Sequence, residues 1–313
     1  MNSKVVVVGV GAVGSATAYA IAIRGLCSQL VLVDVNAEKA EGEAMDINHA
    51  MPVLGGGVRV SSAGYEACAD ADVIIMTAGV GRKPGETRLD LAAKNAAICK
   101  DITENIMKHY NGGVILIATN PVDVITSLVT KWTGLPKGKV VGSGTTLDNT
   151  RLQYEISKYA GVDVDSIHGY ILGEHGDSQF VSWDLTNISG VDVATYFKVV
   201  GKEFNDEVKE KIANDTKTGG GQVIKRKGVT NMGIAACLAD VTQSILGNSM
   251  RIHTVSTMMD GLYGIDGVAL SILSIVGADG VVQQLDCPLS DDELGKLKHS
   301  AEQIRAVLDG VSN

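Results

Sequence analysis

The sequence predicts an α/β fold built on a doubly wound parallel sheet, and three observations carry that prediction. Short apolar runs without alternating polar residues recur along the first half of the 313-residue chain, as expected for strands that are buried on both faces. Longer segments with helical periodicity separate these runs. A glycine-rich turn joins the first run to the first helical segment, at the edge where such sheets bind ligands.

Strands and helices alternate through this first half. The strands are expected at 4–9, 30–34, 58–61, 72–77, 113–118 and 139–142. The helices between them are expected at 12–25, 36–49, 88–110 and 122–133. Because each helix returns the chain to the same edge of the sheet, the strands run parallel and their carboxyl ends meet there.

The first predicted strand leads directly into a G-x-G-x-x-G turn made of Gly9, Gly11 and Gly14. Gly9 allows the tight turn, Gly11 lets the backbone approach a pyrophosphate, and Gly14 lets the next helix pack closely on the sheet. Val13 lies at the start of that helix, where free N–H groups favour an anion. The pattern is that of the Rossmann dinucleotide-binding fold.

Asp34 closes the second predicted strand, twenty residues after Gly14. A carboxylate in this place accepts hydrogen bonds from the adenosine ribose and repels a 2′-phosphate, so NAD is expected as the cofactor rather than NADP. A glycine-rich turn without a ligand is the plainer interpretation. The strand, turn, helix and acid in the right order favour the dinucleotide.

Composition argues against several classes of protein. The formal net charge of −9 disfavours nucleic acid as a partner, because phosphate binding needs a basic surface. The apolar start of the chain is too short to span a membrane and runs straight into the glycine turn. The five cysteines are scattered without a C-x-x-C pair, so we expect neither disulfides nor zinc, and a cytoplasmic setting.

The second half of the chain has a different pattern. Short strands are expected at 169–173 and 181–184, a long one at 268–276 and another from 281, with helices at 202–217, 231–247 and from 290 to about 308. The last helix opens with a capping-box signature, Ser290 to Glu293. No linker marks the change, so we expect a dinucleotide-binding domain over 1–144 and an α+β substrate domain over 145–313.

Five polar segments carry candidate chemistry. They are 77–88, 119–123, 147–151, 173–177 and 227–231. The first has the glycines and charges of a surface loop that closes over a site. Plainer interpretations make Asp148 and Arg151 an exposed helix pair and His175 an ordinary turn histidine. No second histidine or cysteine has suitable spacing for a metal site at His175, so no metal is expected.

Taken together, these segments resemble the L-lactate/malate dehydrogenase family over essentially the whole chain, with the bacterial lactate branch as the nearest likeness. The motifs G-x-G-x-x-G, K-P-G-E-T-R-x-D-L, N-P-V-D, L-D-x-x-R and G-E-H-G-D occur here in that family's order. The resemblance implies an NAD-dependent enzyme that interconverts a small 2-oxo acid and the L-2-hydroxy acid.

The resemblance also implies roles for particular residues. His175 would be the proton donor and acceptor, Asp148 would hold its ring, and Arg151 would bind the substrate carboxylate. Arg88 would polarise the reacting carbonyl. Further residues would line the substrate pocket, namely Arg82, Asn120 and Thr230. Those that would line the cofactor pocket are Thr77, Gly79, Asn120 and Ser143.

The chemistry of 2-oxo acid reduction supports these roles independently. Histidine titrates near neutral pH, and a neighbouring carboxylate raises its pKa, so it can deliver a proton to the carbonyl oxygen. A bidentate arginine fixes a carboxylate in position and direction. A second cation stabilises the negative charge that develops on oxygen once the loop has excluded water.

On the choice of substrate the patterns disagree. In the family, lactate enzymes commonly carry glutamine before the K-P-G-E motif and malate enzymes carry arginine, and this chain has Arg82. Opposite pyruvate a fully buried arginine costs about 3–5 kcal/mol, unless its charged head reaches solvent. The segment 85–91 and Thr230 resemble the lactate branch. We expect pyruvate, with oxaloacetate as the alternative, and the small Val80 and Gly81 leave room for a bulkier 2-oxo acid.

Further expectations concern regulation and assembly. In allosteric bacterial members of the family, a histidine at the position of His168 helps bind fructose 1,6-bisphosphate across a subunit interface. These members also carry an arginine at the position where this chain has Gln153. Losing a cation weakens such a site, so weak or absent activation is expected, with His168 a partly buried strand histidine. The family forms dimers and tetramers, and a homotetramer is favoured here. An NAD-binding protein without redox activity is the alternative from another class.

Overall fold

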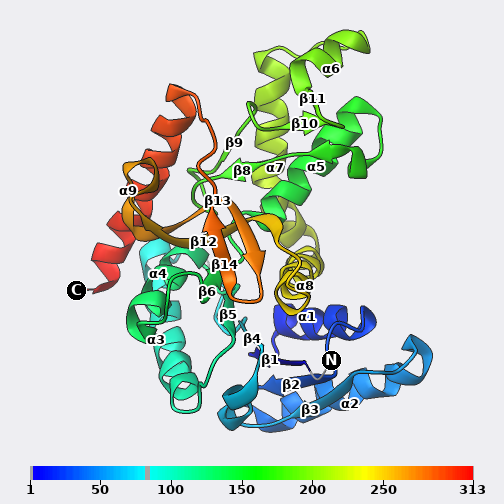
Figure 1. Cartoon of the computed structure of the whole chain (residues 1–313), viewed down its shortest axis with the longest axis vertical. Helices are drawn as coiled ribbons and strands as arrows, with labels where there is room; N and C mark the ends of the chain where they lie inside the picture. Colours follow the sequence, from blue (N-terminus) through cyan, green and yellow to red (C-terminus); the bar gives the residue numbers. More distant parts are fainter. Residues whose placement is uncertain (1–2, 82–84, 313) are drawn as a thin grey trace.

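The computed structural model describes residues 3–81 and 85–312, except for the side chains of Arg88 and Ser312. A nine-stranded sheet in the order β14-β13-β12-β6-β5-β4-β1-β2-β3 runs through both halves of the chain. In Figure 1 the first half, coloured blue to cyan, lies below the second half, coloured green to red. The prediction of a doubly wound parallel α/β sheet followed by an α+β region is confirmed.

Six parallel strands form the first part of the sheet. They are β1 (Lys4–Val8), β2 (Gln29–Val33), β3 (Arg59–Ser62), β4 (Val73–Met76), β5 (Val114–Ile117) and β6 (Val140–Gly142). Each bound agrees with the sequence prediction to within one residue. The order reverses between β1 and β4, which creates the crevice at the carboxyl ends of the strands where ligands bind in such sheets.

Helices cover both faces of this sheet. The first half contributes α1 (Ala12–Ile23), α2 (Ala37–Leu54), the 3₁₀ turn η1 (Tyr65–Asp70), α3 (Arg88–Met107) and α4 (Val122–Thr133). Within β1, Val5 and Val7 face the core shared with α1, α2 and α8, whereas Val6 and Val8 face the core shared with α3, α4 and α9. This two-sided burial explains why the strands read as continuous apolar runs.

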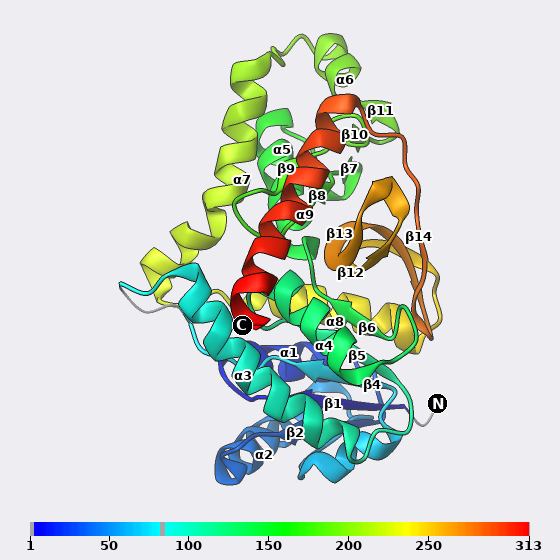
Figure 2. The same ribbon diagram turned by 90° about the vertical axis from the view of Figure 1, so that its left-hand side faces the viewer.

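The second half begins with α5 (Thr146–Ala160) and continues with small elements. These are η2 (Val164–Ser166), β7 (Ile167–His168), β8 (Ile171–Leu172), β9 (Phe180–Val181), β10 (Asn187–Ile188), β11 (Val191–Asp192) and α6 (Val193–Val199). The long elements follow: α7 (Asp206–Lys227), α8 (Met232–Leu246), β12 (Arg251–Asp260), η3 (Leu262–Gly264), β13 (Asp266–Gly277), β14 (Gly280–Gln284) and α9 (Asp291–Ser312). Figure 2 shows α7 and α9 as the two long helices of this half.

Strand β12 is absent from the sequence prediction. It pairs antiparallel with β13 along its length and joins the parallel strands beside β6. Its buried positions include the hydroxyl side chains of Thr254, Ser256 and Thr257. A search for apolar runs therefore passes over this strand, although it is an interior strand of the sheet, between β13 and β6.

The predicted bounds of two helices are also wrong. Helix α2 continues past position 49, because Pro52 in its last turn removes only one N–H and Gly55, with φ 91°, ends the helix in the left-handed conformation. Helix α7 starts four residues later than expected and continues past 217 to Lys227, straight through three consecutive glycines. Two of these glycines lie against Arg151, and a larger residue at Gly220 would crowd its guanidinium.

A third apolar core lies in the second half and joins α5, α6 and α7. Its centre is Phe197, which is fully buried. The ring stacks on Phe204 at 5.0 Å between centroids and meets Tyr159 and Tyr196 edge-on at 5.2 and 5.5 Å. Within the described residues, no helix is long and apolar enough to cross a membrane.

We expect Phe197→Ala to lower the free energy of unfolding by about 3–5 kcal/mol, because it removes a buried aromatic ring and leaves a cavity. Urea denaturation followed by circular dichroism measures the change. Val199→Ala, on the same helix with Val199 78% exposed, is the control and should change stability by less than about 0.5 kcal/mol. Equal effects of the two substitutions would contradict the assignment of Phe197 to a packed core.

Candidate active site

The glycine turn after β1 is shaped by close contacts. Gly9 has φ +96°, and a Cβ on it would lie 2.6 Å from Ala78. A Cβ on Gly14 would lie 1.8 Å from the Gly9 carbonyl oxygen, so only glycine lets α1 approach the turn this closely. A Cβ on Gly11 would meet nothing within 4 Å, which leaves that side of the turn open to a ligand.

A cavity of about 580 Å³ opens beside this turn. Its polar side includes Gly9, Gly11, Asp34, Thr77 and Gly79, and α3 supplies apolar wall residues that include Ala97, Ile98 and Ile102. Five of the predicted cofactor residues therefore line one space. Val13 and Gly14 lie behind it in the first turn of α1.

Asp34 ties the end of β2 to the glycine turn. Its Oδ2 accepts the N–H of Val10 at 2.7 Å and its Oδ1 accepts the N–H of Asn36 at 2.9 Å. Thr77 fixes the other side of the turn, because its hydroxyl donates to the Gly9 carbonyl at 2.6 Å. Gly79 is closely packed as well, since a Cβ on it would lie 2.7 Å from Thr119 Cγ2.

These features fit a dinucleotide. No side chain caps the N-terminus of α1 at Gly11, so the N–H groups of its first turn face the turn and favour a pyrophosphate. The apolar wall suits a flat base, and the carboxylate of Asp34 lies at the sheet edge for ribose hydroxyls. The fit depends on three glycines. A Cβ on Gly11 would project into the open space for the ligand, and a Cβ on Gly9 or Gly14 would clash with neighbouring atoms of the protein.

A second group of side chains gathers around His175, which follows β8. Its Nδ1 lies 2.5 Å from Asp148 Oδ2, and the other oxygen of Asp148 accepts from Arg151 Nη1 at 2.9 Å. Asp148 and Arg151 lie one turn apart on α5. The structure thus brings together three of the residues that the sequence analysis singled out for catalysis and carboxylate binding.

Burial rules out the plainer interpretation of Asp148 and Arg151 as an exposed pair. Asp148 is only 1% exposed, and the side chain of Arg151 is 18% exposed. Buried carboxylates require partners, and this one has two cations. Although burial alone would raise the pKa of Asp148, the charges of His175 and Arg151 lower it, so the carboxylate stays ionised.

The same contacts act on the histidine. The charge of Asp148 is the largest influence and raises the pKa of His175 to about 9, against the opposing effect of burial. The ring is still 26% exposed, so its far side can meet a ligand. With Nδ1 hydrogen-bonded to Asp148, Nε2 is the nitrogen left to exchange a proton with a substrate.

Asp123 is a residue of this site that the sequence analysis did not single out. It lies in the first turn of α4 and is 2% exposed, and its Oδ2 accepts the backbone N–H of His175 at 2.7 Å. The N-P-V-D motif contained the signal, since a carboxylate so close to the carboxyl end of β5 has no obvious structural task. The contact to position 175 is long-range and could not be read from spacing.

Gly219 and Gly220 were also missed. A Cβ on Gly220 would lie 3.0 Å from Arg151 Nη2, and one on Gly219 would lie 3.5 Å from Arg151 Cδ. Gly220 therefore makes room for the guanidinium beside α7, whereas a Cβ on Gly219 would only touch the Arg151 side chain. Three consecutive glycines inside a helical pattern were the available signal, because each costs helix stability unless close approach requires it.

Among the described residues, the other predicted site residues make no hydrogen bond to the group around His175, and two of them are not fully described. Asn120 is exposed at the end of β5 and its carbonyl accepts from Asn95, while Ser143 is buried directly after β6. Thr230 is half-buried between α7 and α8. Arg82 and the side chain of Arg88 lie outside the described part of the chain.

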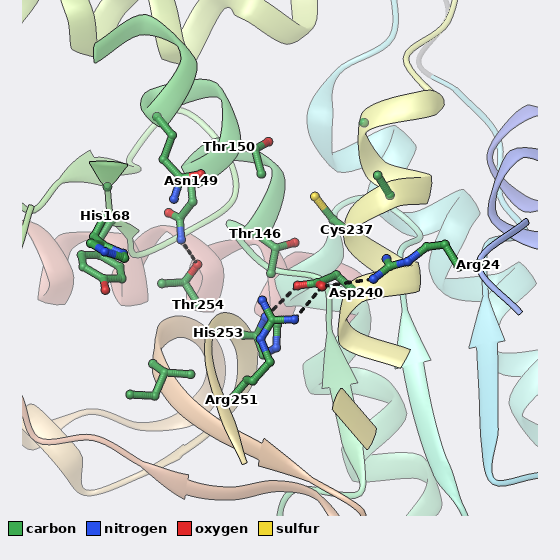
Figure 3. A pocket seen from close by; sticks show the side chains of 16 residues that line it. Arg24, Thr146, Asn149, Thr150, His168, Cys237, Asp240, Arg251, His253 and Thr254 are labelled. Carbon is green, nitrogen blue, oxygen red and sulfur yellow. Dashed lines mark hydrogen bonds and ion pairs between the residues drawn. The ribbon is translucent and has the colours of Figure 1, made fainter. Parts of the chain in front are cut away.

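A separate cavity of about 550 Å³ lies between α5, α8 and β12 (Figure 3). His168 and Gln153 are among its lining residues, and Asp240 pairs there with Arg24 and Arg251 at 3.6 and 2.7 Å. His168 is exposed on β7, so the expectation of a partly buried histidine is wrong. The strand is only two residues long, and its alternation turns Ile167 inward instead.

Metal chemistry has no support in the described ranges, where no group of three or more histidine, cysteine, aspartate or glutamate residues is arranged to hold an ion. Four of the five cysteines are buried and all are unpaired.

Comparisons with known proteins agree with this geometry. Residues 3–142 match the family model of the lactate/malate dehydrogenase NAD-binding domain, and residues 145–313 match that of the family's alpha/beta C-terminal domain. L-lactate dehydrogenase 1 of Clostridium acetobutylicum is 42% identical over 310 residues, 99% of each chain. The L-lactate dehydrogenase of Thermoanaerobacter sp. strain X514 is 41% identical over 98% of each chain.

Solved structures give the same result. The ligand-bound minor L-lactate dehydrogenase of Enterococcus mundtii superposes with a TM-score of 0.95 at 40% identity over 98% of each chain. The L-lactate dehydrogenase of Clostridium thermocellum has a TM-score of 0.86 at 46% identity, covering 99% of this chain and 100% of its own. The chain belongs to the lactate/malate dehydrogenase family, and its first half is that family's NAD-binding domain.

Proposed function

We propose that this protein is an NAD-dependent L-lactate dehydrogenase, which converts pyruvate, NADH and a proton to L-lactate and NAD⁺ and catalyses the reverse reaction. The observation that carries the proposal is the contact between His175 and Asp148 at 2.5 Å, with Arg151 on the other oxygen of the same carboxylate. In that arrangement His175 can supply a proton, and Arg151 beside it can bind the carboxylate of the substrate.

The arrangement explains the chemistry step by step. Arg151 binds the substrate carboxylate and so presents the neighbouring carbonyl to His175. When bound, NADH supplies the hydride to the carbonyl carbon. His175 donates its Nε2 proton to the carbonyl oxygen, and Asp148 stabilises the imidazolium before transfer and holds the ring during it. Asn120, Ser143 and Thr230 are proposed to line the pocket.

Arg88, the first residue of α3, and Arg82, which precedes that helix in the sequence, complete the proposed site. Arg88 would polarise the carbonyl, as the resemblance implies. Pyruvate is favoured over oxaloacetate, because relatives at 41–42% identity over nearly the full length are L-lactate dehydrogenases. A preference for pyruvate requires that the charged head of Arg82 can reach solvent, because an unpaired buried arginine would be costly.

Other properties are proposed with it. We place the division between the two domains at 144 and 145, which the ranges of the two family models support. A cytoplasmic homotetramer fits the family resemblance. We expect weak or no activation by fructose 1,6-bisphosphate, since Gln153 is uncharged where it lines the cavity together with His168.

The substrate is tested by initial rates of NADH oxidation with pyruvate and with oxaloacetate at matched concentrations. Pyruvate should give a kcat/KM at least tenfold higher, roughly 1.4 kcal/mol in transition-state binding. Preference for oxaloacetate would assign specificity to Arg82, and Arg82→Gln should then shift the preference toward pyruvate. A panel of 2-oxo acids with larger side chains tests the third possibility, and inactivity with every member would favour a protein that only binds NAD.

The role of His175 is tested by His175→Asn. The variant should bind NADH nearly as well as the wild type, measured by fluorescence titration, while kcat for pyruvate falls by roughly 10²–10⁴-fold, the usual contribution of general acid catalysis. His168→Asn is the matched control, because His168 lies on β7 and lines a different cavity. Turnover that survives in His175→Asn would show that another group donates the proton.

The pH dependence follows from the raised pKa of His175. Pyruvate reduction needs the imidazolium, so its rate should stay constant through neutral pH and fall as the pH rises through about 9. Lactate oxidation needs the neutral ring and should rise over the same range. Asp148→Asn removes the largest cause of the raised pKa and should move both transitions to lower pH. Profiles that do not move in this variant would contradict the assignment.

A further inference from the structure

The short segment 173–178, called here the histidine segment, carries His175 and has glycines at its first and fourth positions. Glycine leaves a chain more conformational freedom than any other residue, so a proton donor in such a segment needs support from its surroundings. Asp148 holds the ring of His175 and Asp123 accepts its backbone N–H. The rest of the histidine segment is held by other groups.

Ser300 of α9 contacts both ends of the histidine segment. Its hydroxyl donates to the Ser178 carbonyl at 2.8 Å. At the other end Gly173 has φ +93°, and a Cβ on it would lie 2.5 Å from Ser300 Oγ, so the main chain approaches the hydroxyl closely. One side chain of α9 therefore lies against the segment both where it begins and where it ends.

Ser300 is an exception on the buried face of α9. The core residues of this face are apolar and recur every three or four positions, namely Leu297, Ala301, Ile304 and Leu308. Ser300 lies among them and is fully buried. A buried hydroxyl costs stability unless it is hydrogen-bonded, and an apolar residue of similar size would avoid that cost. The serine therefore indicates a task at the carbonyl to which it donates.

Glu174 closes the histidine segment from within. Its Oε2 accepts the N–H of Ser178 at 3.3 Å and the Ser178 hydroxyl at 2.5 Å. Gly176 leaves the space for this arrangement, because a Cβ on it would lie 2.6 Å from Glu174 Oε1. The segment thus forms a small closed loop around His175, and Ser178 is the point where Glu174 and Ser300 both attach.

Two further elements hold this loop from outside. Gly173 exchanges backbone hydrogen bonds with Ser271 of β13, at 3.0 and 3.1 Å. Lys217 of α7 donates from Nζ to the Asp177 carbonyl at 2.6 Å. The loop is therefore attached to β13, α7 and α9, and only α9 reaches both of its ends through one side chain.

We propose that Ser300 and Glu174 are positioning residues, which fix the main chain of the histidine segment so that His175 meets the substrate carbonyl at the right distance. The proposal rests on the proposed function, since it takes His175 as the proton donor. It assigns a task to the glutamate of the G-E-H-G-D motif and to α9. A small displacement of a proton donor slows the reaction strongly, because the reacting atoms must lie within hydrogen-bond reach.

Ser300→Ala tests the attachment to α9. The rate constant for hydride transfer should fall by roughly 10-fold, whereas the affinity for NADH should change by less than about twofold, because the cofactor cavity is untouched. Stopped-flow loss of NADH absorbance in a single turnover, with enzyme in excess and saturating pyruvate, measures the rate constant. Slowing with 4-deuterated NADH identifies it with the chemical step. A protein that is only less stable would give a smaller amplitude with an unchanged rate constant.

Glu174→Ala and Glu174→Gln test the closure of the loop. Alanine removes the acceptor for Ser178 and should lower the same rate constant by roughly 10-fold. Glutamine keeps an oxygen that accepts from Ser178, so it should retain the wild-type rate constant to within about threefold. Equal losses in the two variants would show that the charge of Glu174 matters rather than the closure, and would overturn this part of the proposal.

Ser274→Ala is the matched control. Ser274 is also fully buried and its hydroxyl also donates to a main-chain carbonyl, that of Ile272 at 3.2 Å, but both residues belong to β13. The single-turnover rate constant of this variant should match that of the wild type. An equal fall would show that the loss of any buried serine slows the reaction, and the assignment of Ser300 would be wrong.

The outcomes separate this inference from the proposed function. A wild-type rate constant in folded Ser300→Ala or Glu174→Ala rejects the role of that residue, and wild-type values in both overturn the proposal. If one alanine variant fails to fold, the other decides. Turnover that survives in His175→Asn would reject the proposed function itself, whereas an inactive His175→Asn with unaffected Ser300 and Glu174 variants rejects only this inference.

Discussion

The buried carboxylate of Asp148 is the constraint on which the rest of the site depends. A charge that is 1% exposed is stable only when its partners are held in place, and this one is shared between His175 and Arg151. One bond is made within a single turn of α5, whereas the other spans 27 residues to the segment after β8. The proton donor and the carboxylate-binding arginine are therefore set at a fixed spacing by one side chain.

The sheet brings these groups together. Helix α4 follows β5 and helix α5 follows β6, so Asp123 and Asp148 both come from the first turns of helices at the carboxyl edge of neighbouring parallel strands. A carboxylate in the first turn of a helix is favoured by the helix dipole, which partly offsets the cost of burying it. The dinucleotide cavity opens at the same edge, beside β1 and β4. Parallel topology thus places the cofactor cavity and the two carboxylates that contact His175 at the same edge of the sheet.

Much of this could be read from the sequence, and the failures have physical causes. The six parallel strands were placed to within a residue because burial on both faces leaves an unbroken apolar run. Strand β12 was missed because several of its buried side chains carry hydroxyl groups, so the segment does not appear as an apolar run in the sequence. The spacing of Asp148 and Arg151 was equally consistent with an exposed pair, because it reports their shared helix face and not whether that face is buried. Asp123 was missed because its contact to His175 depends on how α4 packs.

The two carboxylates differ because their surroundings differ. Asp148 contacts two cations, which lower its pKa against the effect of burial, whereas burial prevails at Asp123 and raises its pKa, because the groups bonded to it are a neutral backbone N–H and a hydroxyl. Counting charges, the cations of His175 and Arg151 are matched by the carboxylates of Asp148 and Asp123 when both are ionised, so these four side chains sum to zero. A monocarboxylate then needs one further cation, which Arg88 supplies in the proposed site, and a dicarboxylate needs a second, for which the chain offers Arg82.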